Sequence, residues 1–238
     1  MLGRFLEYSL ATPDIRASLE FYTKLGFSQA EVGEAWNHPY AVLTDGRLCL
    51  GLHQQEEFSP SVTFVKPELL KHLSALEKRG ANFEFRRLGN DVFNEVGWLD
   101  PAGHLIRLIE ARTFSPSKRQ DLDTSLCGYF VELALPAPDV EVAKSFWEGF
   151  GFVGMDEPDA LLPHVACTSD TVDIGLYDSA QLPAPTLLYE VDELRKTLAD
   201  LGASGITASG RVPAPLRGTA ALLYSPEGTA ILMTAAAH

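Results

Sequence analysis

The sequence predicts an α+β fold of two tandem domains, each built from two paired units of one strand, one helix and three further strands. The chain has 238 residues, which suits two domains of common size. Long segments of its first half return in its second half, and within each half residues at helical spacing alternate with short apolar stretches. The expected domains are residues 1–112 and 126–238, joined by a linker at 113–125 that is rich in Ser, Pro and charged residues.

The internal repeat is the strongest signal in the sequence. Three segments return in the same order: residues 7–27 as 132–152, residues 39–52 as 163–176, and residues 100–108 as 225–233. The offset is 125 for the first and third segments and 124 for the second, which places Gly51 opposite Gly175. Because order and spacing persist over about a hundred residues, we expect both halves to share one fold.

The first half divides into two such units. After a first strand, Pro13 and Asp14 supply a helix start, and Gly26 supplies the stop. Three short apolar stretches then predict strands, at 27–32, 40–44 and 47–53. The pattern recurs as a strand at 62–65, a helix at 67–79 ended by Gly80, and strands within 83–87, 92–99 and 104–111.

Composition and charge exclude several classes of function. No apolar run reaches the roughly 18 to 20 residues of a membrane-spanning helix, and the first residues lack the apolar stretch of a signal peptide, so we expect a cytoplasmic chain without a membrane partner. The net charge of −13 opposes binding to nucleic acid. This charge is uneven, at −1 for residues 1–120 and −12 for residues 121–238. Three cysteines without CxxC spacing are interpreted as small buried side chains.

The repeated segment resembles the signature of the vicinal oxygen chelate superfamily, which includes glyoxalases, bleomycin-resistance proteins and extradiol dioxygenases. The resemblance rests on residues 13–27 and 138–152 and on the turn at 100–106, and it covers nearly the whole chain. It implies that two units pair into a U-shaped mixed sheet whose concave face holds a metal or a ligand. We call the concave face of the first domain the first cup and that of the second domain the second cup.

The resemblance also implies up to four metal-ligand positions in each cup. In this sequence they hold Glu7, Gly51, Ser61 and Arg107 in the first cup and Glu132, Gly175, Thr186 and Leu232 in the second. A divalent metal generally needs three or more oxygen, nitrogen or sulfur donors, and an arginine opposes its charge. We therefore expect no metal and no other cofactor at these positions. New ligands from His38, His53 or His164 are the alternative.

Strand alternation identifies the side chains that face each cup, since residues two apart share a face of the sheet. Glu7 and Arg107 are expected to face one another in the first cup and to form an ion pair, with Glu7 and His53 as candidate catalytic residues. The candidate ligand-binding residues are Glu7, Ser9, Trp36, Tyr40, His53 and Arg107 in the first cup, and Glu132, His164, Asp173 and Tyr177 in the second.

Three functional hypotheses follow. The first is a metal-independent small-molecule binding protein whose first cup takes an anionic or carboxylate ligand, because a guanidinium matches carboxylate geometry. The second is a glyoxalase-like lyase or isomerase with a relocated active site, in which Glu7 or His53 is the general base. The third is a non-catalytic interaction scaffold. Since the chain already contains four units, we expect a monomer or a homodimer.

Overall fold

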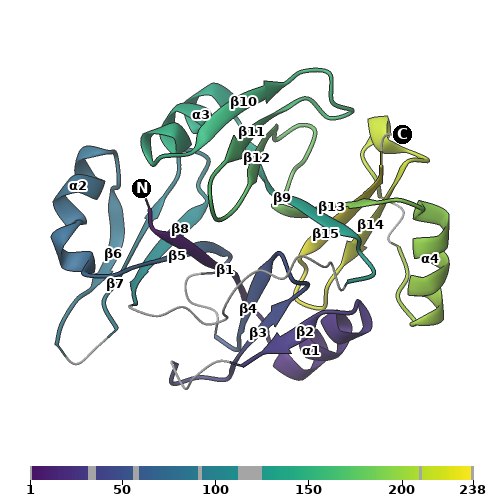
Figure 1. The fold of residues 1–238 in the computed structure, drawn as a ribbon, viewed down its shortest axis with the longest axis horizontal. Helices are drawn as coiled ribbons and strands as arrows, with labels where there is room; N and C mark the ends of the chain where they lie inside the picture. The colour runs from purple at the N-terminus through teal and green to yellow at the C-terminus, as the bar shows by residue number, and fades with distance from the viewer. Residues whose placement is uncertain are drawn as a thin grey trace.

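The computed structural model describes residues 2–31, 36–55, 59–90, 93–111, 125–208 and 211–236, which form two mixed β-sheets with helices packed against them (Figure 1). This arrangement confirms the α+β class. The expected linker at 113–125 lies outside the described residues except for Ser125.

The first sheet has eight described strands in the order β2-β3-β4-β1-β5-β8-β7-β6. Its strands are β1 (Arg4–Ala11), β2 (Ser28–Ala30), β3 (Tyr40–Thr44), β4 (Cys49–His53), β5 (Ser61–Lys66), β6 (Phe83–Arg87), β7 (Glu95–Leu99) and β8 (Leu105–Glu110). The helices of this half are α1 (Ile15–Lys24), the 3-10 turn η1 (Leu69–Lys71) and α2 (Leu73–Lys78). The single helix expected at 67–79 is thus two short pieces, preceded by Glu68 at a φ of 54°.

The second sheet has seven described strands in the order β10-β11-β12-β9-β13-β15-β14. Its strands are β9 (Tyr129–Ala137), β10 (Val153–Glu157), β11 (His164–Thr168), β12 (Ile174–Asp178), β13 (Thr186–Val191), β14 (Ala220–Tyr224) and β15 (Ala230–Ala235). Its helices are α3 (Val140–Gly149), α4 (Leu194–Ala203) and the 3-10 turn η2 (Ala214–Leu216).

The fourth unit departs from the expected pattern. Among the described residues, α4 is followed by two strands rather than three, and the sheet ends at β14. The described residues that precede β14 contain Pro213 and Pro215 around η2. By the offset of the repeat, the strand equivalent to β6 would fall at residues 208–212, of which 209 and 210 lie outside the described residues.

Equivalent residues start the equivalent helices. The Asp14 carboxylate accepts hydrogen bonds from the backbone N–H groups of Arg16 and Ala17 at 3.0 and 3.2 Å, and the Asp139 carboxylate accepts one from Val142 at 3.0 Å. Capping of this kind contributes about 1 kcal/mol to the stability of a helix. The repeat therefore sets both helices in the same place relative to their sheets.

The two halves share one apolar core. Trp98 of β7 lies against Phe150, with ring centroids 5.7 Å apart, and the Tyr189 hydroxyl donates to the Asp45 carboxylate at 2.7 Å. Leu50 of β4 and the leucines two residues before and after it pack in this core. The residues between them therefore lie on the concave face, as alternation predicts. No helix in the described residues is long and apolar enough to span a membrane.

Candidate functional site

Glu7 lies at the centre of the first cup and is 1% exposed. Its Oε1 accepts hydrogen bonds from the Ser9 hydroxyl at 2.7 Å and from Nε2 of His53 at 2.9 Å. Its Oε2 accepts one from the Tyr40 hydroxyl at 2.5 Å. Three donors on three elements thus converge on one carboxylate, which is the arrangement that stabilises its charged form.

The strand register explains this convergence. β1 runs parallel to β4 and pairs Ser9 with Gly51 and Ala11 with His53, while β3 pairs Tyr40 with His53. The Glu7 side chain turns toward β4 and lies over Gly51, where an added Cβ would overlap its carboxylate. The glycine therefore provides the space into which the carboxylate folds.

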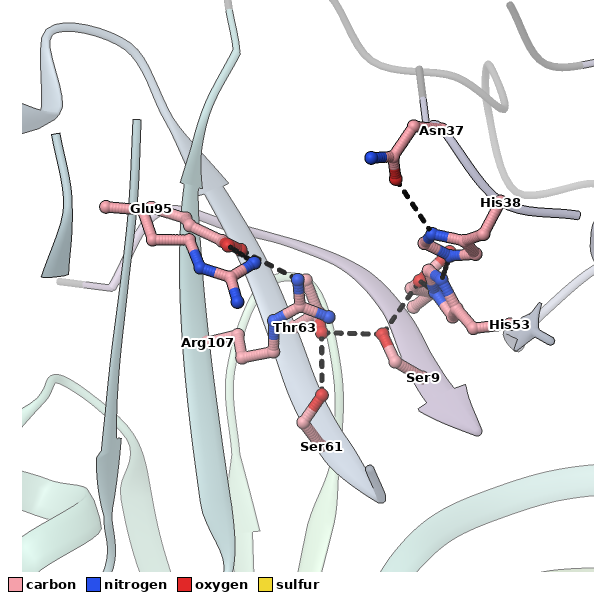
Figure 2. Close-up of polar contacts among 10 residues, drawn as sticks. Ser9, Asn37, His38, His53, Ser61, Thr63, Glu95 and Arg107 are labelled. Atoms are coloured by element: carbon pink, nitrogen blue, oxygen red, sulfur yellow. Dashed lines mark hydrogen bonds and ion pairs between the residues drawn. The ribbon is translucent and has the colours of Figure 1, made fainter. Parts of the chain in front are cut away.

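A chain of hydrogen bonds extends from this carboxylate in both directions (Figure 2). Nδ1 of His53 lies 2.9 Å from Nε2 of His38, which leads toward the outside of the cup. On the other side, the Ser9 hydroxyl lies 2.7 Å from that of Thr63, and Thr63 lies 3.2 Å from the hydroxyl of Ser61. Glu7 is consequently connected across the cup from the His38 side to β5.

The surroundings shift three pKa values in this group. Burial acts to raise the pKa of Glu7, but the hydrogen bond and charge of His53, with the Tyr40 and Ser9 hydroxyls, outweigh it and hold that pKa below its usual range. Burial and the Glu7 charge raise the pKa of Tyr40. Burial and the charges of His53 and Arg107 lower the pKa of His38. At neutral pH the site therefore holds an anionic Glu7 and a neutral His38.

Arg107 pairs with Glu95, and the expected ion pair between Glu7 and Arg107 is wrong. Nη2 of Arg107 lies 2.7 Å from Oε2 of Glu95, and the two side chains are 5% and 3% exposed. β7 pairs Gly97 with Arg107, so Glu95 lies diagonally beside the guanidinium on the same face. Arg87 of β6 reaches the other oxygen of Glu95 at 3.2 Å. Alternation along β7 would have indicated Glu95 as an inward residue, because Glu95 and Gly97 are two apart.

A polar pocket of about 260 Å³ opens beside these groups. It is lined by Trp36, Asn37, His38, His53, Gln55, Arg87 and Arg107. Of the residues expected to bind a ligand in the first cup, Trp36, His53 and Arg107 line this pocket, while Glu7, Ser9 and Tyr40 form the hydrogen-bonded group behind His53. Alternation along β6 could have identified Arg87, whereas Asn37 and Gln55 lie outside the strands and carry no periodic signal.

Aromatic rings surround one side of this pocket. The Trp36 ring lies 5.4 Å from the ring of His53 and 6.1 Å from that of Tyr40, and the Arg107 guanidinium lies 5.3 Å from the Trp36 ring centroid. Guanidinium and indole at this distance attract one another. Trp36 thus lies beside the cation as well as beside the imidazoles, and its role in binding a ligand stays a prediction.

The second cup also brings its predicted residues together. The Tyr177 hydroxyl donates to Oε1 of Glu132 at 2.6 Å, and the His164 ring stacks on Tyr177 at 4.6 Å with Nε2 3.7 Å from Glu132. Burial raises the pKa of Glu132, only partly opposed by His164 and Tyr177, and the charge of Asp173 adds to the increase. Ligand binding by these four residues stays a prediction.

Apolar side chains fill the second cup. A separate buried cluster joins Tyr177 to side chains from the sheet, from two loops and from η2: Ala134, Leu162, Leu182, Leu216, Leu222, Ala230 and Leu232. The two cups differ in polarity along one row of residues that pair with each other across neighbouring strands. In the first cup this row is Glu7, Thr63, Arg107 and Gly97, and in the second it is Glu132, Leu188, Leu232 and Leu222. The polar pocket thus belongs to the first cup.

The residues in these cups do not fit the metal that the resemblance implies. The strand pairs Ser9–Gly51 and Ser9–Ser61 bring the implied ligand positions together, but Glu7 is the only carboxylate or imidazole among the four. Within the described part of the chain, no three His, Cys, Asp or Glu side chains are arranged to hold a metal ion. The two histidines instead form a linear chain with Glu7.

Comparison with known proteins supports the fold. No family model and no curated protein matches the sequence. Among solved structures, a catechol 2,3-dioxygenase superposes with a TM-score of 0.61 and 14% identity, covering 99% of this chain and 93% of that one. Homoprotocatechuate 2,3-dioxygenases from Brevibacterium fuscum, as a variant, and from Arthrobacter globiformis give TM-scores of 0.63 and 0.62, each with 18% identity over 98% of this chain and 71% and 80% of theirs. The chain therefore shares its fold with these dioxygenases, which is the fold that the sequence predicted.

Proposed function

We propose that the first cup binds a small carboxylate-bearing molecule and does so without a metal ion. The observation that carries this proposal is the pair of arginines, Arg87 and Arg107, that line one pocket and share the carboxylate of Glu95. A guanidinium held in place by a buried carboxylate is pre-organised, so little side-chain entropy is lost when it binds an anion.

The charge at the arginine end of the pocket suits a single anionic group. Arg87 and Arg107 place two guanidinium groups at this end of the pocket, beside the carboxylate of Glu95. A guanidinium matches the geometry of a carboxylate and can bind it through two hydrogen bonds. The lowered pKa of His38 keeps this imidazole neutral, so it adds no further charge near neutral pH.

The size of the pocket suits a molecule with one ring. Its volume of about 260 Å³ lies below the roughly 300 to 1,000 Å³ of most drug-sized sites, yet exceeds the roughly 150 Å³ cavity that accommodates benzene. Trp36 offers a ring face along one wall. The structural neighbours are named for catechol and homoprotocatechuate, small aromatic molecules, and an aromatic carboxylate is the form of that size which the arginines favour.

Calorimetry with benzoate and benzamide tests this proposal. The two have the same shape, and only benzoate carries the charge, so wild-type protein should bind benzoate at least about tenfold more tightly, equivalent to about 1.4 kcal/mol. Binding should persist in EDTA. Trp98 and Trp147 are fully buried, so quenching of the remaining tryptophan, Trp36, provides an independent signal.

Two variants distinguish the pocket from general charge attraction. Arg107→Gln should abolish the preference for benzoate. Arg86→Gln removes the neighbouring cation of β6, which pairs with Glu77 on the surface, and should leave the preference unchanged. Equal binding of benzoate and benzamide, or loss of binding in EDTA, would contradict the proposal.

A further inference from the structure

A second pocket lies where the first sheet meets the second half of the chain. We propose that it binds a neutral, mostly apolar molecule with one hydroxyl group, and that the hydroxyl of Tyr8 is the hydrogen-bond partner of that group. The site is separate from the carboxylate site of the first cup, since the two pockets have no described lining residue in common. It therefore does not depend on the proposed function.

The walls of this pocket are largely apolar and come from both halves. Its volume of about 460 Å³ lies within the range of sites for small molecules, and it is partly open to solvent. Strands β5, β6, β7 and β8 contribute to it from the first sheet. Its apolar lining includes Pro60, Phe85, Leu99 and Leu105 from the first half and Leu135 and Pro185 from the second.

Hydrogen bonds of the turn between β7 and β8 fix the wall that joins the two halves. The Asp100 carboxylate accepts backbone hydrogen bonds from Ala102 and His104 at 2.9 and 2.8 Å. Nε2 of His104 in turn lies 2.7 Å from the carbonyl oxygen of Pro136 on β9. The pocket is thus formed before a ligand binds, so little ordering is required on binding.

Tyr8 brings a buried hydroxyl without a protein partner to this pocket. The residue is 3% exposed and lines the pocket, and its hydroxyl makes no hydrogen bond to any residue that the structure describes. Burial raises the pKa of Tyr8, so the hydroxyl keeps its proton at neutral pH. A buried hydroxyl without a partner is unfavourable, and in a pocket open to solvent either water or a polar atom of a ligand supplies that partner.

The other hydroxyl groups in the described lining already have partners. The Ser59 hydroxyl accepts a hydrogen bond from the backbone N–H of Ala11, and the Ser61 hydroxyl lies 3.2 Å from that of Thr63. Tyr8 therefore supplies the hydroxyl that is left for a ligand.

The charges around this pocket favour a neutral ligand. Glu84 of β6 lines it with an exposed carboxylate, and no lysine or arginine is among its described lining residues. A carboxylate ligand would meet a negative charge here without the arginines of the first cup. A phenol or an alcohol carries no charge near neutral pH and matches the Tyr8 hydroxyl as donor or acceptor.

The probes 2-naphthol and naphthalene test this site by equilibrium dialysis at pH 7. They share one ring system, and only 2-naphthol carries a hydroxyl. Wild-type protein should bind 2-naphthol about two- to tenfold more tightly than naphthalene, the range for one neutral hydrogen bond. Tyr8→Phe should reduce the affinity for 2-naphthol to that for naphthalene. Tyr224→Phe, a change of an exposed tyrosine on β14, is the matched control and should bind both probes as wild-type protein does.

A second variant locates the binding. Leu99 lines the pocket and is 42% exposed, so Leu99→Trp fills the pocket from its open side and should abolish binding of both probes. Leu70→Trp, at an exposed leucine of η1, is the control and should leave binding unchanged.

Urea unfolding tests the premise without a ligand. Tyr8→Phe should be as stable as wild-type protein, because the hydroxyl that it removes has no partner in the protein. A clearly lower midpoint would overturn the inference, since it would reveal such a partner. Equal binding of the two probes to wild-type protein would also overturn it, because water alone would then serve Tyr8. The same holds if neither probe binds, or if Leu99→Trp binds them as wild-type protein does. None of these results bears on the binding of benzoate in the first cup.

Discussion

The carboxylate of Glu7 lies directly over the Cα of Gly51, in the space that any other side chain at that position would occupy. The same relationship joins Glu132 to Gly175 in the second cup. In both cups the glycine belongs to the strand parallel to that of the glutamate, and it pairs with the residue two positions after the glutamate. A glycine at this position therefore decides where the buried carboxylate points, and through it which donors it meets.

Gly51→Ala should destabilise the protein by about 1 to 3 kcal/mol, since the added methyl group overlaps the carboxylate and displaces it from its three donors. Urea unfolding at pH 7 measures this. The control is Gly202→Ala on α4, where nothing lies within 4 Å of an added Cβ. That change should leave stability unchanged or raise it by up to about 1 kcal/mol. Equal effects at both glycines would contradict the role assigned to Gly51.

Glu7→Gln should make the free energy of unfolding less dependent on pH. The folded pKa of Glu7 lies below its unfolded value of about 4.3, so this group contributes stability above that pH and loses it as the pH falls through the folded pKa. At pH 7 the variant should be less stable than wild-type protein by about 1.5 to 3 kcal/mol, the range for hydrogen bonds to a charged group.

The difference in free energy of unfolding between wild-type protein and Glu7→Gln should become smaller as the pH falls below about 4. The control Glu84→Gln, an exposed residue of β6, should change stability by less than about 0.5 kcal/mol at every pH. Unfolding by urea from pH 3 to 7 provides both curves. A constant difference over this range would show that the three hydrogen-bond donors do not stabilise the charge of Glu7.

The repeat and the alternation of side chains predict most of this site. Asp14 and Asp139 cap equivalent helices, and Glu7 and His53 face the cup as their strand positions require. The ion pair of Arg107 was assigned to the wrong partner. It depends on the register of β7 against β8, which is set by the turn at Asp100, whose carboxylate accepts backbone hydrogen bonds from Ala102 and His104. Residue spacing alone does not determine that register.

The filling of the second cup could not be predicted for a different reason. Leu162, Leu182 and Leu216 lie in segments between strands, where no periodicity indicates which way a side chain turns. They lie over the apolar residues of the sheet, and burial of their own apolar surface is sufficient to hold them against it. The first cup has no such driving force, because Thr63 and Arg107 occupy the equivalent row.

Glu132→Gln should have the opposite pH dependence to Glu7→Gln. Burial raises the folded pKa of Glu132 above its unfolded value, so the folded protein favours the protonated carboxyl. Its contribution to stability is fully present below about pH 4.3 and is lost as the pH rises through the folded pKa. At pH 7 the variant should be as stable as wild-type protein or more stable, and its advantage should disappear toward pH 4. A loss at pH 7 above about 1 kcal/mol would show that His164 stabilises the charged form instead.

Glu95→Leu should be among the most destabilising single changes in the first cup, because it leaves the buried guanidinium of Arg107 without its carboxylate. Removing one partner of a buried ion pair typically costs about 3 to 5 kcal/mol, whereas replacing both partners by apolar residues is often neutral. The double variant Glu95→Leu with Arg107→Met should therefore recover most of the lost stability.

The exposed pair Lys24 and Glu20 of α1 provides the comparison. Its side chains are 47% and 69% exposed, so replacing either residue should reduce stability by less than about 1 kcal/mol. A double-mutant cycle by urea unfolding measures the coupling of Glu95 with Arg107. Coupling as small as that of the surface pair would mean that Arg107 is held mainly by Trp36 and its other neighbours, and the pre-organisation assigned to Glu95 would be wrong.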